Sequence, residues 1–226
     1  MVRDLAVEWL GLVPYADGLE MQRVAVEARR RGTAGDRLLL LEHPPVVTLG
    51  RSSRLEHLLL SREELAARGV EIHEVGRGGD VTYHAPGQLV GYLILDLEAR
   101  GAADVHRFLR SIEAGLIDAL AELGVPACAL PGMTGVFVDR ARSRRPRADG
   151  AERKLASIGV ALRGWVSFHG FALNLSTDLS GFRSIVPCGL RGVEMTSVAV
   201  ETGGAGEDLA ERGRRAVSRA FRGRFS

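Results

Sequence analysis

Lysine is almost missing from this chain of 226 residues: among its 30 lysines and arginines, Lys154 alone is a lysine. Arginine cannot release its proton in a protein, whereas a desolvated lysine can act as a base. Cysteine is also scarce, because Cys128 and Cys188 are the only two. Two are too few for a disulfide framework, and their presence fits a reducing compartment. The formal net charge of +2 is too small to indicate nucleic-acid binding.

Long apolar runs are missing as well. None approaches the length of about 20 residues that a membrane-spanning helix needs. Asp4 and Glu8 interrupt the apolar N-terminus, which therefore lacks the core of a signal peptide. With 46% hydrophobic and 26% charged residues, the composition is typical of a globular protein. We therefore expect a cytoplasmic protein that contacts neither a membrane nor nucleic acid.

The spacing of apolar residues predicts both strands and helices. We expect helices over 15–31, 61–68, 104–123 and 207–221, with a short helix or loop at 178–184 and a strand or helix start at 194–200. We expect strands over 5–13, 37–42, 46–49, 70–75, 89–97, 127–130, 135–139, 155–163, 165–169 and 171–175. No repeat or linker is apparent. The sequence therefore predicts one α/β (α+β) domain over residues 1–226, with a mixed β-sheet flanked by helices.

An arginine-rich segment precedes the lone lysine. Residues 140–153 carry six arginines and show no apolar periodicity, which predicts a mobile, solvated loop. The loop can be read as a tolerated insertion or as a basic surface that steers an acidic partner.

The stretch 74–92 is the richest in functional groups. It places arginine, aspartate, threonine, tyrosine, histidine and glutamine among several glycines, between two apolar runs. Glycines let backbone amides approach a ligand closely, and loops on a rigid scaffold commonly carry binding groups. A tight hairpin rich in turn residues is the alternative interpretation.

Cys188 has two interpretations of its own. A free cysteine commonly behaves as a small buried hydrophobe, whereas a nucleophile needs a nearby base or cation that favours the thiolate. Cys188 lies between residues that restrict and then free the backbone, while Cys128 has only apolar neighbours. We therefore expect Cys128 to be the inert one of the two.

Metal and dinucleotide sites have little support in the sequence. No C-x-x-C or H-x-x-x-H pair is present, Val81 stands where a dinucleotide fingerprint needs its third glycine, and there is no P-loop. Two histidines, His84 and His169, lie beside glycine-rich polar segments and are candidates for proton transfer or for structural hydrogen bonds. The others are expected to be ordinary surface or core residues: His43, His57, His73 and His106.

Four segments occur in a specific order: 77–92, 154–160, 169–174 and 185–189. Together with 40–50, they resemble the lipoyl(octanoyl) transferase (LipB) family over nearly the whole chain. Departures from the family pattern are small and comprise Ala85, Leu93, Ser157 and the arginine-rich insertion.

The resemblance implies a fold related to the biotin and lipoate protein ligases. It also implies transfer of an octanoyl or lipoyl group from acyl carrier protein to a lysine of lipoyl domains, without a cofactor. The acceptors would be 2-oxoacid dehydrogenase complexes and the glycine cleavage H protein. The family's nucleophile falls on Cys188, its catalytic lysine on Lys154, and a possible supporting residue is His169. Its substrate-binding segments fall on Arg77, Gly78, Gly79, Asp80, Val81, Thr82, Tyr83, His84, Ser157, Ile158, Gly159, Gly170, Phe171 and Ala172.

The chemistry of thioester exchange agrees with a catalytic pair formed by Cys188 and Lys154. A neutral lysine could accept the Cys188 proton, and backbone amides in the glycine-rich segments could stabilise the oxyanion. Strands over 158–162 and 171–175 could line an apolar slot for the acyl tail.

Two other functions stay open. One is an ATP-dependent lipoate or biotin ligase working through an acyl-adenylate, and the other is a non-catalytic binding module with a buried Cys188.

Overall fold

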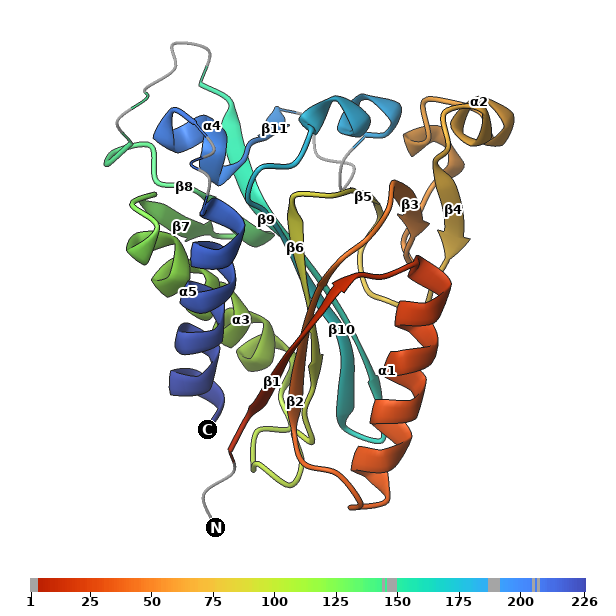
Figure 1. Cartoon of the computed structure of the whole chain (residues 1–226), viewed down its shortest axis with the longest axis vertical. Helices are drawn as coiled ribbons and strands as arrows, with labels where there is room; N and C mark the ends of the chain where they lie inside the picture. Colours follow the sequence, from red (N-terminus) through yellow and green to blue (C-terminus); the bar gives the residue numbers. More distant parts are fainter. Residues whose placement is uncertain (1–3, 144, 146–149, 187–191, 205, 207) are drawn as a thin grey trace.

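A mixed β-sheet forms the centre of the molecule in the computed structural model, which describes residues 4–143, 145, 150–186, 192–204, 206 and 208–226 (Figure 1). Within these residues the strand order is β1-β2-β6-β10-β9-β8-β7, and β11 pairs with β9. The β1–β2 and β9–β11 pairs are parallel and the others are antiparallel. The strands are β1 (Ala6–Leu12), β2 (Arg37–Glu42), β6 (Gln88–Ile94), β7 (Ala127–Leu130), β8 (Met133–Val138), β9 (Glu152–Arg163), β10 (Val166–Asn174) and β11 (Val193–Met195).

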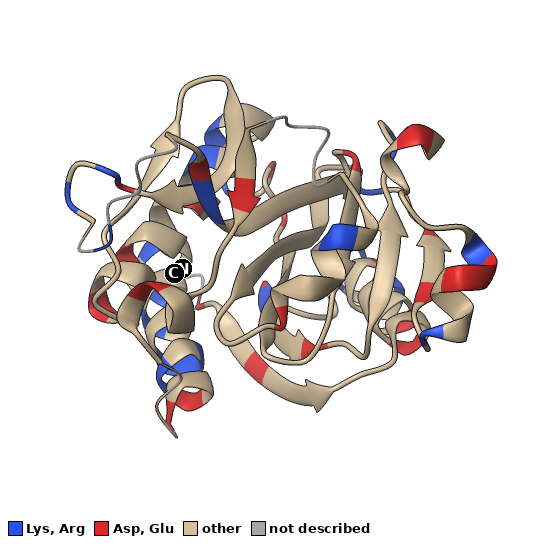
Figure 2. Cartoon of the chain, turned by 90° about the horizontal axis from the view of Figure 1, so that it is seen from above, with Lys and Arg blue, Asp and Glu red and all other residues tan. Residues whose placement is uncertain are grey.

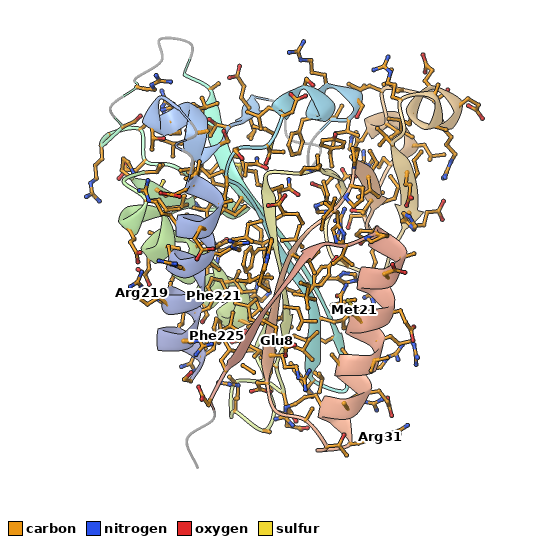
Figure 3. All side chains as sticks on the ribbon, viewed as in Figure 1. Glu8, Met21, Arg31, Arg219, Phe221 and Phe225 are labelled. Atoms are coloured by element: carbon orange, nitrogen blue, oxygen red, sulfur yellow. The ribbon has the colours of Figure 1, made fainter. Side chains whose placement is uncertain are left out.

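Helices cover both faces of this sheet. The helices α3 (Val105–Glu122) and α5 (Leu209–Phe225) pack together on one face, while α1 (Tyr15–Arg30) lies against β6 and β10 on the other. Phe221 and Phe225 point from α5 toward the sheet (Figure 3), and both are buried in the main core. Full burial of such a side chain stabilises the fold by about 1.5–3 kcal/mol. The mixed sheet flanked by helices confirms the predicted fold class.

The helix α3 confirms the prediction made from its periodic apolar stripe. Phe108, Ile112 and Leu116 are buried on one side of it. The Asp104 side chain accepts a hydrogen bond from the Arg107 amide and caps the helix start.

A second, smaller sheet has the strand order β4-β3-β5. Its strands are β3 (Val46–Leu49), β4 (Glu71–Glu74) and β5 (Val81–His84), accompanied by η1 (Leu55–His57), α2 (Arg62–Ala67) and η2 (Leu179–Ser184). A capping box begins α2, because the Ser61 side chain accepts the Glu64 amide and the Glu64 side chain accepts the Ser61 amide. This sheet has its own core, in which Val47 and Val81 pack with Tyr83 and Phe182.

Two stretches of the chain are divided into elements differently from the sequence prediction. Residues 165–169 and 171–175 were expected to form two strands, but β10 runs without a break. Gly170 marks a close approach instead, because a Cβ there would lie 2.2 Å from the Gly91 carbonyl oxygen. The expected element at 194–200 divides into β11 and a separate helix, α4 (Val198–Thr202), which ends before α5 begins.

The arginine-rich segment 140–153 was predicted to be a loop throughout, but its last two residues belong to a strand. Glu152 and Arg153 belong to β9, and Arg153 is buried, where it forms an ion pair with Glu201 at 2.6 Å. The neighbouring Arg140 and Arg145 are exposed, as expected for a solvated loop.

Charged residues lie mainly on the outer helices and loops, and the central strands carry few of them (Figure 2). Among the described residues, no helix combines the length and the apolar character that crossing a bilayer requires.

Candidate active site

A cavity of about 230 Å³ lies between the smaller sheet and strands β9 and β10. Its walls come from segments far apart in the sequence. The described residues that line it are Tyr15, Arg77, Gly79, Asp80, Val81, Thr82, His84, Val90, Tyr92, Gly132, Met133, Thr134, Lys154, Ser157, Ile158, Gly159, His169, Gly170, Phe171 and Ala172. The fold therefore brings the glycine-rich stretch, the lone lysine and the 169–172 segment to one place.

Most of the binding residues expected from the resemblance line this cavity, and two lie elsewhere. The Gly78 amide donates to the Val160 carbonyl at 2.9 Å, which joins the glycine-rich segment to β9. Tyr83 packs against Phe182 in the second core, with the ring centroids 5.5 Å apart. Cys188 lies outside the described residues. The apolar slot expected from 158–162 and 171–175 is only partly present, because of those two ranges Ile158, Gly159, Phe171 and Ala172 line the cavity.

Lys154 is only 2% exposed, although it carries an amine. Its Nζ donates to the Thr134 carbonyl at 3.1 Å and lies 5.4 Å from the centroid of the Phe137 ring. Space for the side chain depends on Gly135 in β8, where φ is 134°. A Cβ at that glycine would lie 2.6 Å from the lysine Cε. The local backbone is therefore shaped around the lysine stem.

Arg77 places a fixed positive charge in the cavity wall. Its side chain is 8% exposed and donates through Nη2 to both the carbonyl and the Oγ1 of Thr48, each at 2.8 Å. Nη1 donates to the Gly78 carbonyl at 3.1 Å. Arginine stays charged at any physiological pH, so this group supplies a permanent positive field but no proton.

The two candidate histidines are neutral bases in the structure. Burial, the neighbouring His43 and the charge of Arg77 lower the pKa of His84 to about 3. Burial and then Arg77 lower the pKa of His169 to about 4. The His84 Nδ1 lies 2.6 Å from Oε1 of Gln88. Because that amide oxygen can only accept, Nδ1 donates, and Nε2 is the basic nitrogen.

A buried aromatic cluster extends from this cavity to α1, and no sequence motif indicated it. His43 was expected to be ordinary, yet its Nδ1 lies 2.6 Å from the Val13 carbonyl and its Nε2 lies 2.6 Å from the Tyr92 hydroxyl. The Tyr15 ring lies 4.9 Å from that of His43 and 6.1 Å from that of His84. Burial raises the pKa of Tyr15 to about 12, so its hydroxyl stays protonated.

His57 is another residue that sequence reasoning treated as ordinary. Its Nδ1 lies 2.5 Å from Oδ2 of Asp80, whose other oxygen accepts the Val81 amide at 2.7 Å. The His57 carbonyl accepts the Val186 amide at 2.8 Å. This residue therefore connects the glycine-rich segment to the chain at 184–186. The sequence segments singled out above include Asp80, Val81 and Val186 but not His57.

The sequence indicated neither a reactive Cys128 nor a metal site. Burial, with the charges of Asp139 and Glu152, raises the pKa of Cys128, which agrees with the expected inert thiol. Among the residues that the structure describes, no group of three or more histidines, cysteines, aspartates and glutamates is arranged to hold a metal ion.

Comparisons with known proteins give a consistent picture. Residues 14–218 match the profile of the lipoyl protein ligase A/B catalytic domain. An octanoyltransferase of Acidobacterium capsulatum is 50% identical over 85% of this chain and 78% of its own length. An octanoyltransferase of Solibacter usitatus is 44% identical over 97% of this chain and 94% of its own length. A solved structure, a putative lipoate protein ligase from T. acidophilum, has a TM-score of 0.70 at 14% identity and covers 98% of this chain and 85% of that one. At such low identity the structural likeness shows the fold alone.

Proposed function

Because the chain belongs to the lipoyl protein ligase A/B catalytic-domain family, we propose that it is an octanoyltransferase of protein lipoylation. It moves an octanoyl group from acyl carrier protein to a lysine of lipoyl domains. The observation that carries the proposal is the single lysine of the chain, buried in the wall of a small cavity beside the glycine-rich segment. The octanoyltransferase relatives support the substrate, since they match nearly the whole chain.

The first half-reaction is a thioester exchange. Lys154, as the neutral amine, takes the Cys188 proton, and the thiolate attacks the octanoyl carbonyl of the donor. The bond from the carbonyl to the carrier sulfur then breaks, and the lysine ammonium returns its proton to the departing thiolate. The exchange is nearly balanced in energy, because the attacking and leaving groups are both thiols.

The second half-reaction forms the amide. The amine of the acceptor lysine attacks the octanoyl-cysteine carbonyl, and Lys154 removes the extra proton from the attacking nitrogen. The carbon–sulfur bond breaks, and the same proton goes to the Cys188 sulfur, which restores the enzyme. An arginine in this position would provide charge without proton exchange.

The cavity chemistry suits a short acyl tail. Val90, Ile158, Phe171 and Ala172 provide apolar walls. A volume of about 230 Å³ is below the roughly 300–1,000 Å³ of sites for drug-sized ligands. Neutral histidines support the same view, because a charged imidazolium beside hydrocarbon would be costly to desolvate.

An ATP-dependent lipoate ligase is the second candidate, favoured by the fold shared with a putative lipoate protein ligase. The two reactions differ in what they consume. A ligase activates the free acid as an acyl-adenylate and releases pyrophosphate, and Cys188 is dispensable for that chemistry. A transferase uses the energy of the donor thioester and needs no nucleotide.

Intact-protein mass spectrometry separates the candidates. The enzyme is mixed with octanoyl-acyl carrier protein in the absence of ATP, and Cys188→Ala is treated in parallel. We expect a gain of one octanoyl group that hydroxylamine releases and that the variant lacks. Product formation only after addition of ATP and free octanoate would reject the transferase. Carrier-protein binding without any transfer would instead indicate a binding module.

A further inference from the structure

Glu113 is a buried acid that the reaction above does not use. It lies in α3, on the face of the sheet opposite α1, and its side chain is 1% exposed. A carboxylate is costly to bury unless hydrogen bonds or charges compensate it. Such a group in the middle of an otherwise apolar stripe therefore requires an explanation from its contacts.

Among the residues that the structure describes, two groups bind this carboxylate. Oε1 accepts the Gly135 amide at 3.0 Å, and Oε2 accepts Nη1 of Arg110 at 2.5 Å. The Arg110 side chain is 49% exposed, so water weakens the ion pair. The bond to the buried amide is the one that the solvent cannot replace.

The bonded amide adjoins the group that holds the lysine. Thr134 precedes Gly135, and its carbonyl accepts the Lys154 Nζ at 3.1 Å. Regular pairing of β8 with β9 covers Val136 and Phe137 and shifts register between them. The sheet ladder is therefore irregular close to the Thr134–Gly135 peptide, opposite the lysine. A charge-assisted bond from α3 is well suited to fix that peptide.

We propose that Glu113 is a positioning residue for Lys154. Its carboxylate fixes the Thr134–Gly135 peptide, and the Thr134 carbonyl then holds Nζ at the cavity wall. The effect on catalysis rests on the proposed function, whereas the effect on the lysine position does not. A displacement of about 1 Å at a catalytic group can lower a rate by about 100-fold.

The test compares three variants of the full chain. Glu113→Leu removes the acceptor, while Glu113→Gln keeps an amide oxygen that can accept the Gly135 bond. The control is Asp36→Asn. Asp36 is likewise a buried acid that binds arginines and accepts a backbone amide, that of Asp96 at 3.1 Å. It does not line the cavity.

The lone lysine makes a direct readout possible. Lysine labelled with carbon-13 at Cε gives a single side-chain resonance, that of Lys154, in each protein. We expect Glu113→Leu to shift this resonance beyond its linewidth, and Glu113→Gln and Asp36→Asn to leave it near the wild-type position. An unchanged resonance in folded Glu113→Leu would overturn the inference, whatever the activity of the enzyme. If Glu113→Leu does not fold, Glu113→Asp replaces it, because the shortened acid loses reach to Gly135.

Acylation kinetics give the second readout. At saturating octanoyl-acyl carrier protein, we expect Glu113→Leu to form the octanoyl-enzyme at least about tenfold more slowly, with a KM for the donor close to that of the wild type. Glu113→Gln should recover most of the rate, and Asp36→Asn should retain it despite a lower melting temperature. Equal rates in Glu113→Leu and Asp36→Asn would reject the positioning role. No adduct in the wild type would reject the proposed function and leave the resonance test decisive.

Discussion

Acidification from pH 7.5 to pH 5 should destabilise the folded protein through His84 and His169. Their pKa values in the fold, about 3 and about 4, lie below the ordinary 6.5, mainly because burial disfavours the charged ring. As the pH falls below 6.5, the unfolded chain therefore binds protons that the folded chain does not. The free energy of unfolding therefore falls as the pH falls, and above pH 7.5 this free energy is nearly constant.

The magnitude follows from proton linkage. Each such histidine costs about 1.4 kcal/mol per pH unit between its two pKa values. Between pH 7.5 and pH 5 this gives about 2 kcal/mol for one residue and about 4 kcal/mol for the pair. Total stabilities of about 5–15 kcal/mol are usual, so the loss is a large fraction. Burial also lowers the pKa of His43, which acts in the same direction.

Urea unfolding followed by circular dichroism at the two pH values measures this loss. At pH 5 most carboxylates are still ionised, so the histidines dominate the difference. His84→Gln and His169→Gln should each reduce the pH-dependent loss by about 2 kcal/mol. His106→Gln is the control, because His106 is exposed. A wild-type loss under about 1 kcal/mol, or an equal reduction in the control, would refute the assignment of buried neutral histidines.

Three further predictions concern the site and its surroundings. Lys154→Arg should keep the fold and donor binding but lower acylation by about 10²–10⁴-fold, measured by intact mass, and near-normal transfer would reject a proton-handling lysine. His57→Ala should speed hydrogen exchange of the Val186 amide at least about tenfold, because the His57 side chain no longer anchors the carbonyl that accepts it. Unchanged exchange would contradict that link. Arg153→Ala should cost about 3–5 kcal/mol in denaturant unfolding, because the buried Glu201 loses its ion-pair partner, and a cost under about 1 kcal/mol would show that the pair contributes little.

Local sequence signals predicted the elements whose shape depends on local chemistry. The helix α3 follows from apolar residues at three- and four-residue intervals, and α2 follows from the Ser61 capping box. The division predicted at Gly170 was wrong because a glycine inside a strand has two meanings. It can end the strand, or it can admit a neighbouring backbone, and here the Gly91 carbonyl occupies the space.

The residues of the candidate site also fall into two groups, those with a local sequence signal and those without one. Arg77 and Lys154 were predictable because a motif or an unusual composition singled them out. Thr134 and Tyr15 line the cavity without any such signal, since each reaches it only through tertiary packing. Glu113 is the clearest example. Its position within the apolar stripe of a helix says nothing about the amide of Gly135, which a different element of the fold brings to it.

Fold likeness alone does not distinguish a transferase from a ligase. The distinction depends on the chemical roles of two cations in the cavity wall, Arg77 and Lys154. Arg77 is fixed by Thr48 and holds its charge permanently, which suits binding of an anionic group or an oxyanion. Lys154 is buried beside the Phe137 ring and a carbonyl, in a chain whose permanently charged cations are all arginine. Adenylate chemistry requires a positive charge next to the phosphate, which a lysine or an arginine can supply. Transfer between thiol and amine requires a group that gains and loses a proton, and of these two cations only lysine does so. A lysine at this position therefore supplies the proton exchange that direct acyl transfer requires.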